Sequence, residues 1–331
     1  MKIIDPRFEL NIDYFGVKTG MDGVRSAKIR SNLLLDLGVK YWSLVESNSI
    51  KLIDYLDYIT VHDISQVHSD RMIDLIVNNP KKLLSLAYSQ PESDFDAPEA
   101  FVDMIIKAAS SVYKAMDLSL RDKENYFLLQ CYAGAHHARI NKSNGFCVIN
   151  DVAVSLSKLK NEKKINKVLI FDVDAHKGDG NSEIFYNKDF VKTFSIHIDG
   201  WPLNDRSLED YPSTVDVKLP FNCDGKTYLK CLDNGMSALE KNISMEEIDL
   251  VVVLAGSDPW EYDMIVNNPM IPKEKRLLYM TEAELLDRDL RIYDFFKSKS
   301  IPQTWLMSGG YGPNSYKIPL NFLKKNIKFE R

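Results

Sequence analysis

The sequence predicts an α/β fold of three layers, in which a mostly parallel sheet is covered by helices on both faces. Short apolar runs alternate with longer helix-patterned segments through the middle and end of the chain. Several of these runs are apolar at consecutive positions, which is typical of strands buried on both faces of a parallel sheet. No internal repeat or Gly/Ser/Pro-rich linker divides the 331 residues. We therefore expect residues 1–331 to form a single domain.

Five apolar runs are interpreted as strands, and two segments between them as surface helices. The strands are expected at 125–134, 167–176, 191–199, 248–258 and 302–312. The helices are expected at 151–160 and 281–299, where the apolar spacing and the charge content fit an amphipathic helix. Because strand, helix and strand follow one another, the sheet should be open and parallel.

The composition excludes several classes of protein. The net charge is −5, and Lys and Arg are scattered, so we expect no nucleic-acid partner. The four cysteines form no CxxC pair, which favours reduced thiols. Asp5 and Glu9 lie where a signal peptide needs an apolar core, and no apolar run approaches the roughly 18 residues of a membrane helix. These features predict a soluble, cytoplasmic protein without a membrane span.

Polar residues follow four of the predicted strands. In open α/β sheets the ligand site lies beyond the carboxyl ends of the strands, so these residues should converge. They are His136 and His137 after the first strand, Asp172, Asp174, His176 and Asp179 after the second, Ser257 and Asp258 after the fourth, and Ser308, Gly309, Gly310 and Tyr311 after the fifth. This convergence is the strongest functional inference that the residues themselves support.

The segment after the second strand suggests a metal site. Asp172, Asp174 and His176 are spaced by two, so they would share one face of an extended strand. A buried carboxylate is costly unless it is paired or binds a metal. Asp174, His176 and Asp258 make a three-ligand set for zinc that leaves one position open, and Asp172 would support a ligand or hold a second ion. The alternative is a turn whose aspartates cap the next helix.

The adjacent histidines and a tyrosine suit acid–base chemistry beside such a metal. Imidazole has a pKa near neutral pH, and a carboxylate on the far ring nitrogen would orient it. Asp172 and Asp179 are available for this role, so we expect two His–Asp dyads with His136 and His137. Tyr311 follows a Ser-Gly-Gly turn and would donate a hydrogen bond to a developing oxyanion. For all three side chains the alternative is ordinary packing.

Five stretches resemble the zinc-dependent histone deacetylases and their bacterial relatives of the arginase–deacetylase fold. They are GAHHARINKSNGFCVINDVA (134–153), KVLIFDVDAHKGDGNSEIFY (167–186), VKTFSIHIDG (191–200), VVVLAGSD (251–258) and SGGYG (308–312). A weaker likeness upstream, including DISQVHSDRMIDLI, extends the resemblance over most of the chain. It implies a roughly eight-stranded parallel sheet flanked by helices. It also implies one catalytic zinc ion held by Asp174, His176 and Asp258.

The resemblance further implies roles for individual residues. His137 would transfer protons, with His136 as its electrostatic partner. Asp179 and Asp172 would lie behind these histidines. Tyr311 would polarise the scissile carbonyl together with zinc.

Substrate contacts are also implied. Phe146, next to Gly145, would form one wall of a narrow channel that grips the methylenes of a lysine side chain. Asp94 or Asp96, in PESDFDAPEA, would hold the substrate backbone. A solvated acidic loop is the alternative for these two aspartates.

A monovalent cation, usually potassium, would lie near Asp172, where Ser195 and the His176 backbone would contribute. Two residues depart from the family pattern: Lys177 stands where many relatives have a second histidine, and Ser308 stands where many have another glycine. The DAH motif (174–176), the serine before Gly309-Gly310-Tyr311 and the short chain resemble the class IV branch more than class I, and members of that branch are reported to prefer long fatty acyl groups.

The two-manganese arginases of the superfamily place additional aspartates at two positions. This chain has Gly178 at one of them and Trp260 at the other, so a single metal and an amide substrate are favoured. The expected activity is removal of an acetyl or longer fatty acyl group from the ε-amine of lysine in a peptide or protein. The alternatives are an amidohydrolase acting on acylated polyamines and a catalytically silent acyl-lysine binding protein. The sequence indicates no particular oligomeric state.

Overall fold

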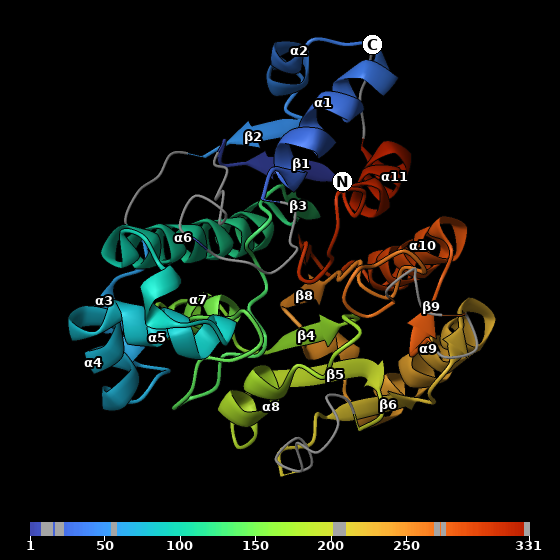
Figure 1. The fold of residues 1–331 in the computed structure, drawn as a ribbon. Helices are drawn as coiled ribbons and strands as arrows, with labels where there is room; N and C mark the ends of the chain where they lie inside the picture. Colours follow the sequence, from blue (N-terminus) through green and yellow to red (C-terminus); the bar gives the residue numbers. More distant parts are fainter. Residues whose placement is uncertain are drawn as a thin grey trace.

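The computed structural model describes residues 1–7, 16, 23–53, 58–200, 210–267, 272 and 276–327. Its centre is an eight-stranded sheet in the order β2-β1-β3-β10-β8-β4-β5-β6, in which neighbouring strands run parallel (Figure 1). These strands are β1 (Lys2–Asp5), β2 (Ile50–Leu52), β3 (Tyr126–Leu128), β4 (Val168–Asp172), β5 (Val191–Ile198), β6 (Val215–Leu219), β8 (Leu250–Leu254) and β10 (Gln303–Leu306). A small second sheet pairs β7 (Cys223–Asp224) with β9 (Leu278–Tyr279). The predicted parallel α/β architecture is confirmed.

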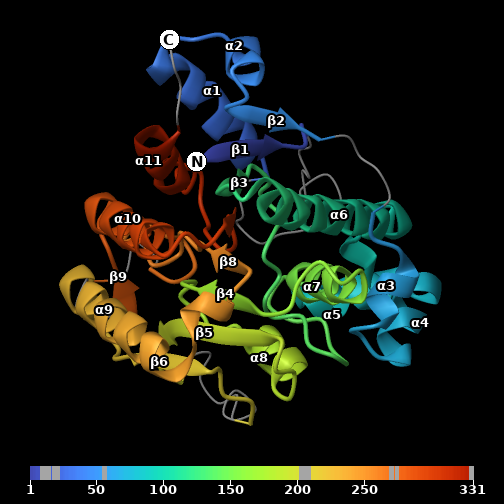
Figure 2. The same cartoon turned by 180° about the vertical axis from the view of Figure 1, so that it is seen from behind.

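Helices cover both faces of the large sheet, as the two opposite views show (Figures 1 and 2). One face carries α3 (Val61–Ser65), α4 (Asp70–Asn78), α5 (Pro80–Tyr88), α6 (Pro98–Asp122), α7 (Asp151–Asn161) and α8 (Asp179–Phe185). The other carries α1 (Arg25–Leu37), α2 (Tyr41–Glu46), α9 (Gly225–Asn242), α10 (Glu282–Ser298) and α11 (Lys317–Asn326). No helix within the described ranges is long and apolar enough to cross a bilayer.

Strand β8 shows why the apolar runs are continuous. Leu250, Val252 and Leu254 pack into the core under α6 and α7, whereas Val251 and Val253 pack into the core under α9 and α10. All five side chains are completely buried. Successive side chains of a strand point to opposite faces, so a strand between two helical layers needs apolar residues at every position.

The strands end earlier than the sequence predicts. β3 stops at Leu128, although the apolar run continues, because the chain turns back on itself at Gln130. The backbone N–H of Gln130 donates to the Leu128 carbonyl (3.0 Å), and its side-chain amide donates to the carbonyls of Ala108 (3.1 Å) and Tyr132 (2.7 Å). Local hydrogen bonds thus replace the ladder, and the residues beyond form a loop over the sheet edge.

Arg288 of α10 ties together two strand ends. Its guanidinium is fully buried and lies 2.8 Å from the Asp289 carboxylate. Its Nη1 donates to the carbonyl of Val173, just beyond β4, at 3.1 Å and to that of Gly256, just beyond β8, at 2.8 Å. Because an unpaired buried carbonyl is costly, this bridge fixes how both segments leave the sheet.

Replacing Arg288 by Met should lower the free energy of unfolding by about 3–5 kcal/mol, because Asp289 would remain buried without its partner. Arg291 on the same helix is a matched control. It pairs with Asp287 and Asp233 near solvent, so Arg291→Met should cost under about 1 kcal/mol. Urea unfolding of both variants measures the difference, and equal losses would contradict the structural role of Arg288.

His68 anchors the loop after β3 to the start of α7. Its Nδ1 donates to the Arg139 carbonyl at 3.0 Å, and its Nε2 accepts from the backbone N–H of Asn150 at 3.0 Å. The contact at Nε2 requires the neutral ring, since a protonated Nε2 cannot accept. Burial lowers the pKa of His68 from 6.5 to about 4.

The unfolded chain binds a proton at His68 below about pH 6.5, whereas the folded chain resists it down to about pH 4. Stability should therefore be complete above this window and fall as the pH drops through it. The His68 share of the loss should reach about 2 kcal/mol near pH 5. Urea unfolding at both ends of the window should show a smaller pH dependence for His68→Gln than for the wild type. His62→Gln, at an exposed position on α3, should behave like the wild type.

Candidate active site

The segment after β4 is a turn rather than an extended strand. β4 ends at Asp172, and the following residues bend around their own carboxylates. Asp172 Oδ1 accepts from the backbone N–H of Asp174 at 3.1 Å, and Asp174 Oδ1 accepts from that of His176 at 3.1 Å. The prediction that these side chains share one face of an extended strand is therefore wrong, because aspartate hydrogen bonds two residues ahead favour a turn.

The turn nevertheless brings three potential ligands together. Asp174, His176 and Asp258 each offer one ligand atom, and these atoms lie within 4.8 Å of one another. His176 Nδ1 is 2.9 Å from Asp174 Oδ1 and 3.1 Å from Asp258 Oδ2. All three side chains are buried at the carboxyl ends of β4 and β8.

This set fits a zinc ion. The other Asp258 oxygen, Oδ1, accepts from the backbone N–H of Ala175 at 3.1 Å, while Oδ2 has no hydrogen-bond donor among the described residues. A buried carboxylate oxygen without a donor, facing an imidazole nitrogen and a second carboxylate, is a ready ligand atom. Burial, together with the neighbouring Asp174 charge, raises the pKa of Asp258 to about 6.

Two glycines leave room around these ligands. A Cβ at Gly256 would lie 2.6 Å from Asp174 Oδ2 and 2.8 Å from Asp258 Oδ1. A Cβ at Gly309 would lie 2.5 Å from Asp174 Oδ2 and 3.0 Å from Asp258 Oδ2. The two carboxylates can approach each other only because the backbone next to them carries no side chain.

The structure places each predicted histidine beside its predicted aspartate. His136 Nδ1 is 2.7 Å from Asp172 Oδ2, and His137 Nδ1 is 2.6 Å from Asp179 Oδ1. A carboxylate only accepts hydrogen bonds, so Nδ1 of each ring carries the proton and Nε2 faces away. The ring centroids of the two histidines are 4.0 Å apart, and that of His137 is 5.5 Å from the ring of His176.

The surroundings shift the pKa values of the two histidines in opposite directions. Burial alone would lower the pKa of His136, but Asp172 and Asp174 raise it to about 10. Burial and the neighbouring His136 lower the pKa of His137, although Asp179 opposes this shift. At neutral pH, His136 is therefore a cation and His137 a neutral imidazole.

Tyr311 lies in the same pocket and keeps its proton. Burial, reinforced by the charges of Asp174 and Asp258, raises the pKa of Tyr311 well above 10. Its backbone N–H donates to Asp263 Oδ2 at 2.7 Å. Asp263 Oδ1 accepts from the backbone N–H groups of Ile265 and Val266. This buried carboxylate therefore fixes Tyr311 relative to the loop after β8.

A cavity of about 420 Å³ is lined by the histidine pair, Asp174, His176, Phe146 and Tyr311, and it extends to Cys131 and Ala133. Phe146 has φ +65°, a strained value for a residue with a side chain, and its ring packs against Tyr311 at 5.8 Å between centroids.

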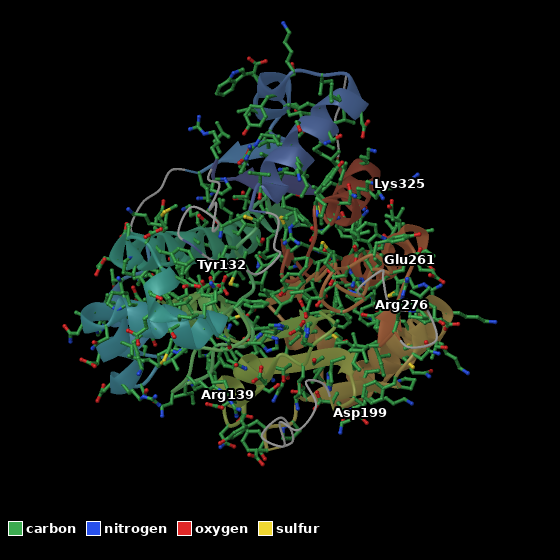
Figure 3. All side chains as sticks on the ribbon, in the orientation of Figure 1. Tyr132, Arg139, Asp199, Glu261, Arg276 and Lys325 are labelled. Carbon is green, nitrogen blue, oxygen red and sulfur yellow. The ribbon has the colours of Figure 1, made fainter. Side chains whose placement is uncertain are left out.

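The strained turn at Phe146 is held from behind. The hydroxyl of Tyr132, labelled in Figure 3, donates to the Phe146 carbonyl at 2.9 Å, and the Tyr88 ring stacks on Phe146 at 6.1 Å. At Gly145, with φ +54°, a Cβ would collide with the His137 ring. The channel wall and the histidine pair are thus positioned by one turn.

Three residues that were predicted to contact the substrate or a potassium ion lie away from the cavity lining described above. Asp94 is half-buried at the end of a short 3₁₀ turn, and Asp96 is exposed. Among the described residues, neither lines the cavity, although Phe95 between them packs on Tyr88 at 6.1 Å. Ser195 pairs with Asp172 across β4 and β5, and its hydroxyl lies 3.0 Å from His197 Nδ1. The potassium ion there stays a prediction.

Sequence reasoning missed the residues that support this site. Arg25 of α1 is fully buried and donates to the carbonyls of Ser308 (2.9 Å), Gly309 (3.2 Å) and Gly310 (3.2 Å). Asp151 accepts from the N–H groups of Gly134 (2.9 Å) and Ala135 (2.8 Å), just before the histidines.

Asp151 follows Asn150, which caps α7 by accepting from the Ala153 N–H, so a capping signal is readable there but does not indicate that Asp151 reaches back to Gly134 and Ala135. Arg25 gives no local signal, since the carbonyls that it binds are more than 280 residues away in the chain.

Comparisons with known proteins place the chain in a family. A family model described as the histone deacetylase domain matches residues 39–320. An uncharacterized protein of Methanocaldococcus jannaschii is 34% identical over 164 residues, which cover 48% of this chain and 43% of that protein. The chain spans about half the length of the curated relatives that it matches.

Solved structures show the same fold. The HDA15 HD domain superposes with a TM-score of 0.72 at 20% identity, covering 99% of this chain and 89% of that one. An acetylpolyamine aminohydrolase from Burkholderia pseudomallei gives a TM-score of 0.69 at 16% identity, covering 98% of each chain. Because the family model matches most of its length, the chain belongs to the histone deacetylase family.

Proposed function

We propose that this chain is a zinc-dependent amidohydrolase that removes an acetyl or longer acyl group from the ε-amine of lysine. We further assign this activity to one catalytic domain over residues 1–331, acting in the cytoplasm. One observation carries the proposal: the Asp174–His176–Asp258 triad adjoins a cavity that also contains the histidine pair and Tyr311. Zinc would be held by these three residues, and when bound it supplies Lewis acidity that acidifies water and polarises a carbonyl oxygen.

The histidine pair supports a division of labour in hydrolysis. Neutral His137 has Nε2 free to accept a proton from the attacking water, while Asp179 holds its Nδ1 proton. Cationic His136, fixed by Asp172, stabilises negative charge that develops beside it. The proton then passes to the departing amine, so the amide and water yield a carboxylate and a free amine.

Tyr311 and Phe146 support the choice of substrate. The protonated Tyr311 hydroxyl donates to the carbonyl oxygen as charge develops on it. The Phe146 ring opposite it offers an apolar wall to a methylene chain. A lysine side chain, which joins four methylenes to an amide, matches this sequence of apolar wall and polar end.

A substrate panel tests the reaction class. Zinc-loaded wild-type protein should hydrolyse acetyl-lysine or long-chain acyl-lysine peptides, and Asp174→Ala should bind no zinc at the triad and show no turnover. Turnover is followed by release of the free amine. Cleavage of acetylated polyamines alone would replace lysine by a polyamine as the substrate. A metal-loaded protein that cleaves nothing on the panel would favour an acyl-lysine binding protein.

Removal of the Tyr311 hydroxyl tests the oxyanion role. Tyr311→Phe should lower kcat by about 10²–10³-fold, because one donor to the developing oxyanion is lost. Its zinc affinity, measured by competition with a chromophoric chelator, should match the wild type. Full activity in this variant would refute the assignment.

A further inference from the structure

Ser308 contacts the Asp174 carboxylate directly. Its hydroxyl donates to Asp174 Oδ2 at 3.2 Å, and the backbone N–H of Gly309 donates to the same oxygen at 3.0 Å. The other oxygen, Oδ1, is the one that faces His176 Nδ1. The two oxygens of Asp174 are therefore divided between the turn at residues 308–309 and the centre of the triad.

The Ser308 hydroxyl has one proton and two nearby acceptors. The carbonyl of Gly134 lies at 3.4 Å, farther than the carboxylate oxygen at 3.2 Å. A hydrogen bond to a charged acceptor is roughly twice as strong as one between neutral groups. The bond to Asp174 therefore prevails.

The backbone of Ser308 has a conformation that is unfavourable for a residue with a side chain. Ser308 has φ +47°, in the left-handed region, where glycine is favoured because it has no Cβ. The side chain is buried. A serine here strains the turn, and its hydrogen bond to Asp174 offsets that strain.

We infer that Ser308 is a positioning residue for the metal ligand Asp174. By holding Oδ2 with the Gly309 N–H, its hydroxyl turns Oδ1 toward the triad and restricts Asp174 to one ligand atom. This inference rests on the proposed zinc function and adds a residue that sets the affinity for the metal. Hydrogen-bond partners of metal ligands commonly change metal affinity by about 10–100-fold when they are removed.

Measurements of zinc affinity and of the stability of the metal-free protein distinguish the effect of the Ser308 hydroxyl from the effect of its strained backbone. Ser308→Ala removes the hydroxyl and keeps the strained Cβ, whereas Ser308→Gly removes both. Both variants should bind zinc about tenfold more weakly than the wild type in competition with a chromophoric chelator. Ser308→Gly should also melt at a higher temperature than Ser308→Ala in the absence of metal, because its turn is relaxed. The two variants would then share the loss of affinity and differ in stability.

Ser257→Ala is the matched control. The Ser257 hydroxyl also donates to this turn, at the Gly309 carbonyl (3.3 Å), and not to a ligand carboxylate. Its removal should change zinc affinity less than twofold. Wild-type affinity in Ser308→Ala would overturn the inference, as would an equal loss in Ser257→Ala. If instead Asp174→Ala binds zinc as tightly as the wild type, the proposed zinc site itself fails, whatever the Ser308 variants do.

Discussion

The site depends on the burial of several carboxylates at one sheet edge. Asp172, Asp174, Asp179 and Asp258 are all nearly inaccessible to solvent. Charges at this depth repel one another strongly and lose their hydration, so opposite charge must be supplied nearby. Cationic His136 supplies part of it, and neutral His137 and backbone N–H groups donate hydrogen bonds to these carboxylates. The same negative charge therefore opposes the folding of this edge and would favour the binding of a cation there.

The same charges make two adjacent histidines chemically different. His136 lies between Asp172 and Asp174, at 2.7 Å and 3.8 Å, and is held as a cation. His137 has a single carboxylate and a cationic neighbour, and remains neutral. Two identical side chains thus differ in charge, because their distances to the carboxylates differ. A bound divalent cation would lower the pKa of His137, as cationic His136 does.

Much of this arrangement could be predicted from the sequence, because its causes are local. Apolar runs marked β3, β4, β5, β8 and β10, and the charged residues after them marked the sheet edge. The strands β1, β2 and β6 escaped detection, since their sequences KIID, IKL and VDVKL contain charged residues and form no continuous apolar run. The turn after β4 was misjudged because a spacing of two fits both a strand and successive aspartate turns. Supporting contacts from Arg25 and Arg288 depend on tertiary packing, which no local pattern reports.

Arg25 and Arg288 hold the loops that carry the candidate site. The chain leaves each parallel strand with carbonyls that no longer belong to a ladder, and burial forbids leaving them without donors. Arg288 supplies donors to the segments carrying Asp174 and Asp258, and Arg25 to the turn carrying Ser308 and Tyr311. One guanidinium comes from α10 and the other from α1. The segments after β4, β8 and β10 are therefore held by two helices of the same layer, and packing of that layer on the sheet fixes how these segments leave it.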